Sequence, residues 1–298
     1  MDDEAGIGLD VSSALALGAR TRQEDALVTS FAQGADVGFA VLSDGMGGHA
    51  AGDLASRIIV TEMFAELTLR TATGQLGDDD YPTLLRYAAE VANECLATHI
   101  SANPSTRGMG GTVVVTLVVG NDLYWLSIGD SPLWLWRDGE LTRLNEDHSM
   151  APQIDMMVAQ GLMDAETARN HPQRSCLTSA IIGENLAAID CPTEPFELRP
   201  NDVVLAASDG LQYLPEAGIS AILKRGARSE SRALADALID GISSVGDPEQ
   251  DNTSVVVIRA EPLPSSQKQT TSDFSVGQML KTILRNVAPA RHAGTEGP

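Results

Sequence analysis

Acidic residues stand at the ends of apolar stretches along this 298-residue sequence. The positions are Glu24-Asp25, Asp44, Asp130, Asp209 and Asp251. Taken singly, each is explained by a turn, because an aspartate hydrogen-bonds to the backbone of its own turn. Taken together, they predict carboxylates that converge where strands end. Converging carboxylates repel one another, and their pKa values rise unless a cation compensates the charge.

Glycines adjoin three of these aspartates, in the pairs Asp44-Gly45, Gly129-Asp130 and Asp209-Gly210. The stretch "VLSDGMGGHA" (41–50) by itself is explained equally well as a glycine-rich turn between a strand and a helix. Beside an ion, the glycine would let a backbone carbonyl approach where a side chain would block it. Oxygen ligands suit magnesium or manganese rather than zinc. Two such ions about 4 Å apart, bridged by one carboxylate, activate a water and neutralise a phosphate.

Strands, hairpins and amphipathic helices are expected around these positions. We expect a strand that ends at Val41-Leu42, with Asp44 at its tip, and a helix that begins near Ala51. Apolar residues recur at helical spacing over 51–63, 84–99 and 231–242, and 147–175 contains two short helices. Further strands are expected at 14–20, 26–31, 112–120, 121–130, 202–210 and 252–260, with hairpin turns at 120–122 and 138–139. Consecutive strands and paired helices predict an α+β fold of antiparallel sheets covered by helices.

Six stretches resemble, in order, the motifs of the metal-dependent protein phosphatases of type 2C, the PPM family, in a bacterial form. They are "GARTRQED", "VLSDGMGGHAAGDLAS", "SIGDSPLWLWRDGELTRLNEDHS", "SCLTSAIIG", "DVVLAASDGL" and "DNTSVVVI", and the match spans residues 12 to 260. The resemblance implies an antiparallel β-sandwich flanked by helix pairs, in four layers (α-β-β-α), with a small helical flap. It also implies hydrolysis of phosphoserine and phosphothreonine in proteins by a metal-activated water, opposing a serine/threonine kinase.

The resemblance implies a cofactor of Mn²⁺ or Mg²⁺, with two ions in the core site. Asp44 would bridge both ions, and Gly45 would contribute its carbonyl oxygen. Asp209 and Asp251 would complete the ligands of the second ion. Asp130 would bind a third, weaker ion.

The same resemblance assigns the residues around the ions. Glu24 and Asp25 would hold metal-bound waters or lie behind the ligands. Arg20 would bind the substrate phosphate, because a guanidinium contacts phosphate oxygens through two parallel N–H groups. Arg22 is the competing arginine, but its spacing to Glu24-Asp25 fits the family pattern less well.

Three positions depart from the family pattern. Gln23 replaces an asparagine and keeps the amide, and Pro132 replaces an arginine. Met46 stands where many eukaryotic members carry a histidine proposed as a general acid. His49 follows three residues later, and a metal-bound water is the more plausible proton donor.

Composition restricts the class of partner and the compartment. A net charge of −21 argues against nucleic acid, because phosphate backbones need a basic face. Cys95, Cys176 and Cys191 form no CxxC motif, which predicts free thiols in a reducing compartment. There is no secretory signal pattern, and no apolar run reaches the roughly 18 residues of a membrane span. We therefore expect a cytoplasmic, monomeric protein.

We expect three parts along the chain: an acidic segment at 1–11, the catalytic domain at 12–260 with a flap at about 147–175, and a flexible linker with an amphipathic tail at 261–298. Within the tail, "DFSVGQMLKTILRNVA" (273–288) has apolar residues at helical spacing. That stripe could dock on its own domain, on a partner protein or on a membrane surface. We interpret the tail as a targeting element. Phosphoproteins, including a serine/threonine kinase or its substrates, are the expected partners.

Two other functions are compatible with parts of the pattern. Another dinuclear hydrolase, such as a phosphodiesterase, usually uses histidine ligands, and the chain has only 5 histidines. A catalytically silent pseudophosphatase that binds phosphoproteins would be expected to lack a metal carboxylate, and none is missing here. Hydrolysis of p-nitrophenyl phosphate with and without manganese distinguishes these alternatives.

Overall fold

The structure is a computed structural model that describes residues 6–32, 37–47, 51–72, 77 and 80–262. All of them belong to a compact unit that ends at Leu263. His49 and the amphipathic segment predicted at 273–288 lie outside the described residues.

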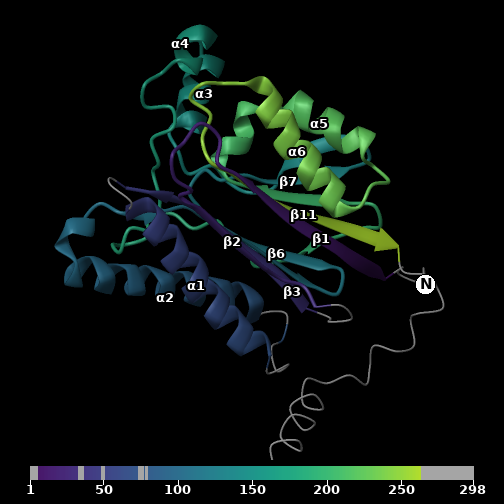
Figure 1. Cartoon of the computed structure of the whole chain (residues 1–298), viewed down its shortest axis with the longest axis horizontal. Helices are drawn as coiled ribbons and strands as arrows, with labels where there is room; N and C mark the ends of the chain where they lie inside the picture. The colour runs from purple at the N-terminus through teal and green to yellow at the C-terminus, as the bar shows by residue number, and fades with distance from the viewer. Residues whose placement is uncertain (1–5, 33–36, 48–50, 73–76, 78–79, 263–298) are drawn as a thin grey trace, which may run out of the picture. The chain divides into compact units, whose positions relative to one another are not determined.

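Two antiparallel sheets form the centre of this unit (Figure 1). The first contains, in order, β1 (Ile7–Ala16), β11 (Thr253–Pro262), β10 (Val203–Ala207), β7 (Leu133–Arg137) and β8 (Glu140–Arg143). The second contains β2 (Asp25–Ser30), β3 (Val37–Met46), β5 (Val113–Val119), β6 (Asp122–Ile128) and β9 (Phe196–Glu197), with β4 (Gly110–Gly111) paired to the end of β3.

Helices cover the outer face of each sheet (Figure 1). The pair α1 (Ala51–Thr71) and α2 (Asp80–Ala102) packs on the second sheet, and the pair α5 (Glu216–Arg225) and α6 (Ser231–Val245) packs on the first. The short helices α3 (Ala151–Ala159) and α4 (Ala165–Arg169) stand apart from these layers. Two 3-10 turns complete the described elements, η1 (Pro104–Thr106) and η2 (Asp209–Tyr213). The predicted four-layer sandwich is confirmed. Among the described helices, none has the length and apolar content to cross a membrane.

Alternating side chains on the strands build the layers. On β3, Val41 packs toward α1 and α2, whereas its neighbour Leu42 packs between the sheets. On β11, Val257 packs toward α5 and α6, whereas Val256 packs between the sheets. Successive strand residues point to opposite faces, so a strand that is covered on both sides is an unbroken apolar run.

Most predicted elements are present. The helices expected at 51–63, 84–99 and 231–242 are α1, α2 and α6, and the two short helices expected within 147–175 are α3 and α4. Both hairpins are confirmed, and Asp138 and Gly139 have the positive φ angles (53° and 90°) that a two-residue hairpin turn requires. The sequence patterns missed α5. β1 begins at Ile7, ahead of the strand predicted at 14–20, because it pairs with β11 along its whole length.

The predicted strand end at Val41-Leu42 is wrong. β3 continues to Met46, so Asp44 and Gly45 lie within the strand. Its pairing with β5 stops at Leu42, and from Gly45 onward its partner is β4. This second partner comes from a distant part of the chain. The end of the apolar run therefore does not mark the end of the strand.

Candidate metal and phosphate site

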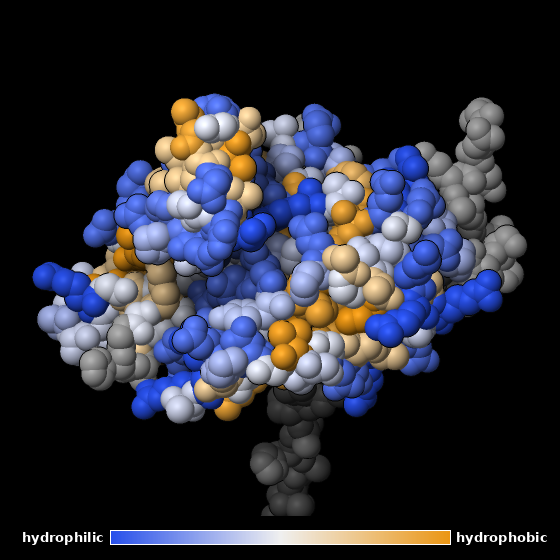
Figure 2. Space-filling view, turned by 90° about the horizontal axis from the view of Figure 1, so that it is seen from above, coloured by the Kyte–Doolittle hydropathy of each residue, from blue (hydrophilic) through white to orange (hydrophobic). Residues whose placement is uncertain are grey.

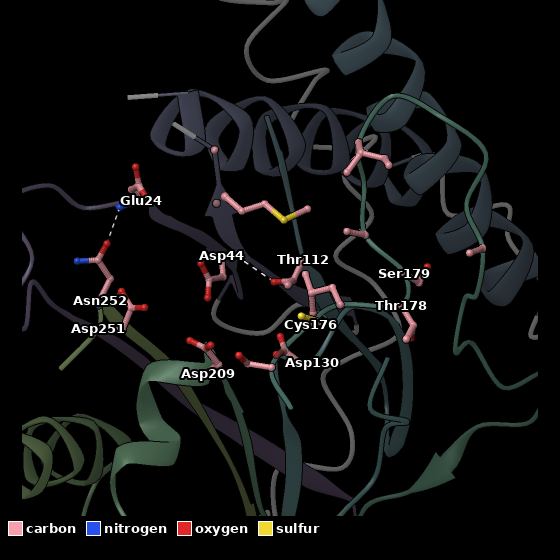
Figure 3. Close-up of a pocket in the computed structure, with 18 of the residues that line it drawn as sticks. Glu24, Asp44, Thr112, Asp130, Cys176, Thr178, Ser179, Asp209, Asp251 and Asn252 are labelled. Atoms are coloured by element: carbon pink, nitrogen blue, oxygen red, sulfur yellow. Dashed lines mark hydrogen bonds between the residues drawn. The ribbon is translucent and has the colours of Figure 1, made fainter. Parts of the chain in front are cut away.

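A pocket of about 620 Å³ lies where β3, β10 and β11 meet the loops that precede or follow them. Figure 2 shows a hollow lined by hydrophilic residues on the face from which α3 and α4 project. Its acidic lining consists of Glu24, Asp44, Asp130, Asp209 and Asp251. The segment 175–180 lines it as well, and in Figure 3 Cys176, Thr178 and Ser179 lie on the side away from Asp251.

Each pocket carboxylate comes from a different part of the fold. Asp44 lies in β3, Asp209 opens η2 directly after β10, and Asp251 precedes β11. Asp130 follows β6, and Glu24 precedes β2. In Figure 3, Asp44, Asp209 and Asp251 surround a common space, with Asp130 beside them. The structure thus brings five of the predicted acidic residues into one pocket.

Asp25 is the predicted acidic residue that does not line the pocket. Its Oδ2 accepts hydrogen bonds from Ser208 Oγ at 2.8 Å and Ser254 Oγ at 2.7 Å. Burial raises the pKa of the Asp25 carboxyl to about 6, although both serine hydroxyls act against this shift. Asp25 is the register partner of Asp44 across β2 and β3. It therefore lies beside Asp44 on the neighbouring strand and joins the second sheet to the first.

Three of the carboxyl groups that face the pocket, those of Asp44, Asp209 and Asp130, are also largely buried. Burial, and then the carboxylates of Asp209 and Asp25, raise the pKa of Asp44 well above its usual range. Burial raises the pKa of Asp209, and burial followed by the charge of Asp209 raises the pKa of Asp130 to about 7. A divalent cation in the pocket would oppose these shifts, because it favours the charged form of each carboxyl group.

The donor set fits a hard divalent cation. Among the described residues, Asp209 Oδ1 is buried and has no hydrogen-bond partner, which leaves it available to a cation. The acidic side chains offer only oxygen, the donor that Mg²⁺ and Mn²⁺ prefer. Within the described part of the chain, no three histidine, cysteine or carboxylate side chains are already drawn together as a ligand cage. The carboxylates instead line an open pocket.

Gly45 and Gly210 permit close backbone packing at the site. A Cβ atom on Gly45 would lie 2.1 Å from the carbonyl oxygen of Gly52, and one on Gly210 would lie 1.9 Å from that of Asn252. The amide of Gly45 also donates to the carbonyl oxygen of Glu24 at 3.1 Å. These glycines are required because the start of α1 and the loop before β11 approach the strand ends so closely.

Arg20 lies at the rim of the pocket, and the competing Arg22 is not among the residues that line it. The Nη2 atom of Arg20 donates to Asp251 Oδ2 at 2.5 Å, and 52% of the Arg20 side chain is exposed. Its guanidinium therefore remains accessible to a ligand that enters the pocket.

Sequence reasoning missed the neutral residues that hold the acidic ones. Thr112 Oγ1 accepts a hydrogen bond from the amide of Asp44 at 3.2 Å (Figure 3) and lies 2.7 Å from Ser131 Oγ. Asn252 Oδ1 accepts from the amide of Glu24 at 2.7 Å. Only Asn252 carried a signal, its place directly after Asp251. Threonine and serine in apolar strands are too common to stand out.

Comparison with known proteins identifies the family to which this chain belongs. The model of the family described as "Protein phosphatase 2C" matches residues 16–240. The serine/threonine protein phosphatase PstP of Mycobacterium tuberculosis is 36% identical over 175 residues, which cover 57% of this chain but only 31% of PstP. The match thus spans about a third of that relative.

Solved structures of PstP share the fold. The crystal structure of Mycobacterium tuberculosis PstP/Ppp superposes with a TM-score of 0.69 and 30% identity, covering 86% of this chain and 99% of that one. The catalytic domain of PstP in complex with two manganese ions gives a TM-score of 0.66 and 28% identity, covering 85% and 100%. Since the family match covers most of the described chain and the fold agrees, the chain belongs to the protein phosphatase 2C family.

Proposed function

We propose that this protein is a metal-dependent serine/threonine protein phosphatase, which hydrolyses phosphoserine and phosphothreonine in other proteins. The observation that carries the proposal is the meeting of Asp44, Asp209 and Asp251 in one pocket with Arg20 at its rim. Family membership and the similarity to PstP support it.

Within this proposal, two Mn²⁺ or Mg²⁺ ions would be held mainly by Asp44, with the carbonyl of Gly45, and by Asp209 and Asp251. The manganese ions in the PstP structure support this cofactor. Asp130 is proposed to hold a third, weaker ion, and its buried, strongly acidic surroundings support that role. When bound, the ions supply an acidified water as nucleophile and neutralise the phosphate.

The chain's own residues position the substrate. Arg20 is proposed to bind the phosphate oxygens. To do so, its guanidinium would release the carboxylate of Asp251, with which it is paired in this structure. Thr112 fixes the backbone at Asp44, and Asp25 supports Asp44 from the neighbouring strand. Glu24, whose side chain lines the pocket, is proposed to orient a water.

Further proposals concern partners and surroundings. The segment 147–175, which contains α3 and α4, is proposed to act as a flap that selects protein substrates. Substrates would include a serine/threonine kinase or its targets.

The free thiols of Cys95, Cys176 and Cys191 support a reducing, cytoplasmic location. Light scattering during gel filtration tests whether the protein is a monomer.

The test is turnover of p-nitrophenyl phosphate and a phosphothreonine peptide in EDTA, Mn²⁺ and Mg²⁺. Activity should require a divalent ion, and Asp44→Asn should lower kcat by about a thousandfold or more. Asp236→Asn, an exposed aspartate on α6, is the matched control and should keep full activity. If the wild-type chain binds Mn²⁺ and phosphopeptide but shows no turnover, it is a phosphoprotein-binding module instead.

A further inference from the structure

A second hollow of about 350 Å³ adjoins the site pocket, and Arg20 lines both. Ala19, Tyr213, Pro248 and Glu249 form the rest of its lining. None of these four residues lines the first pocket, so the two hollows are neighbours that share one arginine.

The second hollow is built on the elements that carry two of the site carboxylates. Tyr213 ends the 3-10 turn η2, which Asp209 begins. Glu249 lies two residues before Asp251, and its carbonyl oxygen accepts a hydrogen bond from Tyr213 Oη at 3.0 Å. The amide of Ala19 donates to the carbonyl oxygen of Gln250 at 2.8 Å. These bonds hold the hollow in a set position relative to the site.

Its lining suits a basic side chain. Tyr213, Pro248 and Ala19 offer an aromatic ring and apolar surface, and Glu249 adds an exposed carboxylate. The surroundings are acidic, since the carboxylates of Asp251 and Asp209 add to burial, the larger cause, in raising the pKa of Tyr213. The one cation in the lining, Arg20, is already paired with Asp251. An ammonium or guanidinium group can stack on the tyrosine ring and pair with the glutamate.

We propose that this hollow binds an arginine or lysine side chain of the phosphoprotein, a few residues from the phosphorylated serine or threonine. The proposal rests on the proposed function, because the phosphate at Arg20 brings the neighbouring residues of the substrate to the hollow.

The test compares phosphothreonine peptides that carry arginine at flanking positions with peptides that carry alanine there. In the full chain with Mn²⁺, kcat/KM should be about three- to tenfold higher for the arginine peptide. Glu249→Gln and Tyr213→Leu should each reduce this preference about threefold, with the rate on p-nitrophenyl phosphate unchanged. Glu94→Gln, an exposed glutamate on α2, makes the same change in net charge and should keep the preference.

Equal kcat/KM for the two peptides in the wild-type chain would overturn the proposal. An equal loss in Glu94→Gln would also overturn it, because it would mean that the net charge alone attracts basic peptides. If neither peptide nor p-nitrophenyl phosphate is hydrolysed, the proposed phosphatase function is wrong, but the binding subsite can still be tested. Fluorescence anisotropy of both labelled peptides with the same variants then decides the subsite by affinity.

Discussion

At the scale of single residues, Arg20 and Arg22 are the two candidates for binding the substrate phosphate at the pocket rim. Arg20 lines the pocket and pairs with Asp251, whereas Arg22 does neither among the described contacts. Arg20→Ala should raise KM for a phosphothreonine peptide by about tenfold and lower kcat less, because phosphate capture serves ground and transition states alike. Initial rates in saturating Mn²⁺ measure both constants. Arg22→Ala is the matched control, and a raised KM in that variant alone would identify Arg22 as the phosphate ligand.

The buried carboxyl groups predict how the metal-free protein responds to pH. Folding raises the pKa of Asp25 to about 6 and that of Asp130 to about 7, from about 3.9 for an exposed aspartate. Between about pH 4 and pH 7 the folded chain keeps protons that the unfolded chain has released, so the free energy of unfolding falls as pH rises. In EDTA, Tm should therefore be several degrees higher at pH 5.5 than at pH 8.

Metal should reverse this trend, because a nearby cation favours the charged carboxylates and so opposes the shifts that burial and neighbouring charges cause. Mn²⁺ should raise Tm more at pH 8 than at pH 5.5, as measured by differential scanning fluorimetry. In Asp130→Asn, the fall of Tm with pH in EDTA should be smaller. A wild-type Tm that rises from pH 5.5 to pH 8 in EDTA would contradict the prediction.

At the scale of elements, the site depends on how closely α1 approaches β3. Gly45→Ala places a Cβ atom 2.1 Å from the carbonyl oxygen of Gly52, and backbone must shift to relieve the contact. We expect a cost of about 3 kcal/mol or more, seen as a drop in Tm of roughly 10 °C. Gly77→Ala is the control, because the nearest atom would be 3.7 Å away. Equal Tm values for both variants would mean that α1 moves aside without cost.

The segment 147–175, which we propose to be a flap, is anchored at its base and apolar at its tip. The amide of Met150 donates to Cys176 O at 3.0 Å, and that of Thr178 donates to His148 O at 2.8 Å. Beyond this base, Met156 and Leu162 are 59% and 70% exposed. Apolar residues are visible in Figure 2 on the projecting part of the molecule that contains α3 and α4.

If the flap selects protein substrates, Met156→Ser combined with Leu162→Ser should lower kcat/KM severalfold on a phosphoprotein. The rate on p-nitrophenyl phosphate should be unchanged, because that substrate is too small to reach the tip. Leu69→Ser, at a leucine 68% exposed on α1, is the control. An equal loss on both substrates would show that the flap supports the site itself.

For the whole molecule, the compact unit must include the complete β11. The strand pairs with β1 through Pro262, which is the register partner of Ile7. A chain that ends at Leu263 should keep its metal-dependent activity and its Tm within a few degrees, since the compact unit ends there. The boundary expected at residue 260 would remove two paired positions, Glu261 and Pro262. A large drop in Tm for the chain that ends at Leu263 would show that the tail stabilises the compact unit.

Local patterns in the sequence were enough to predict every main helix except α5, both hairpins and the residue types of the site. Helical and strand periodicities are properties of neighbouring residues, and the Asp138-Gly139 turn needs only residues that tolerate positive φ. The carboxylates could be singled out because several charges at the ends of apolar runs are costly unless a common ligand compensates them.

Only the tertiary structure decided how those residues are used. Glu24 and Asp25 are neighbours in sequence, yet Glu24 lines the pocket while Asp25 turns inward to Ser208 and Ser254 of the other sheet. β3 continues past Asp44 because β4, far along the chain, pairs with it. The hollow beside Arg20 likewise exists because η2 and the loop before β11 meet there. Each of these outcomes depends on pairing between residues distant in sequence, and no local periodicity contains that information.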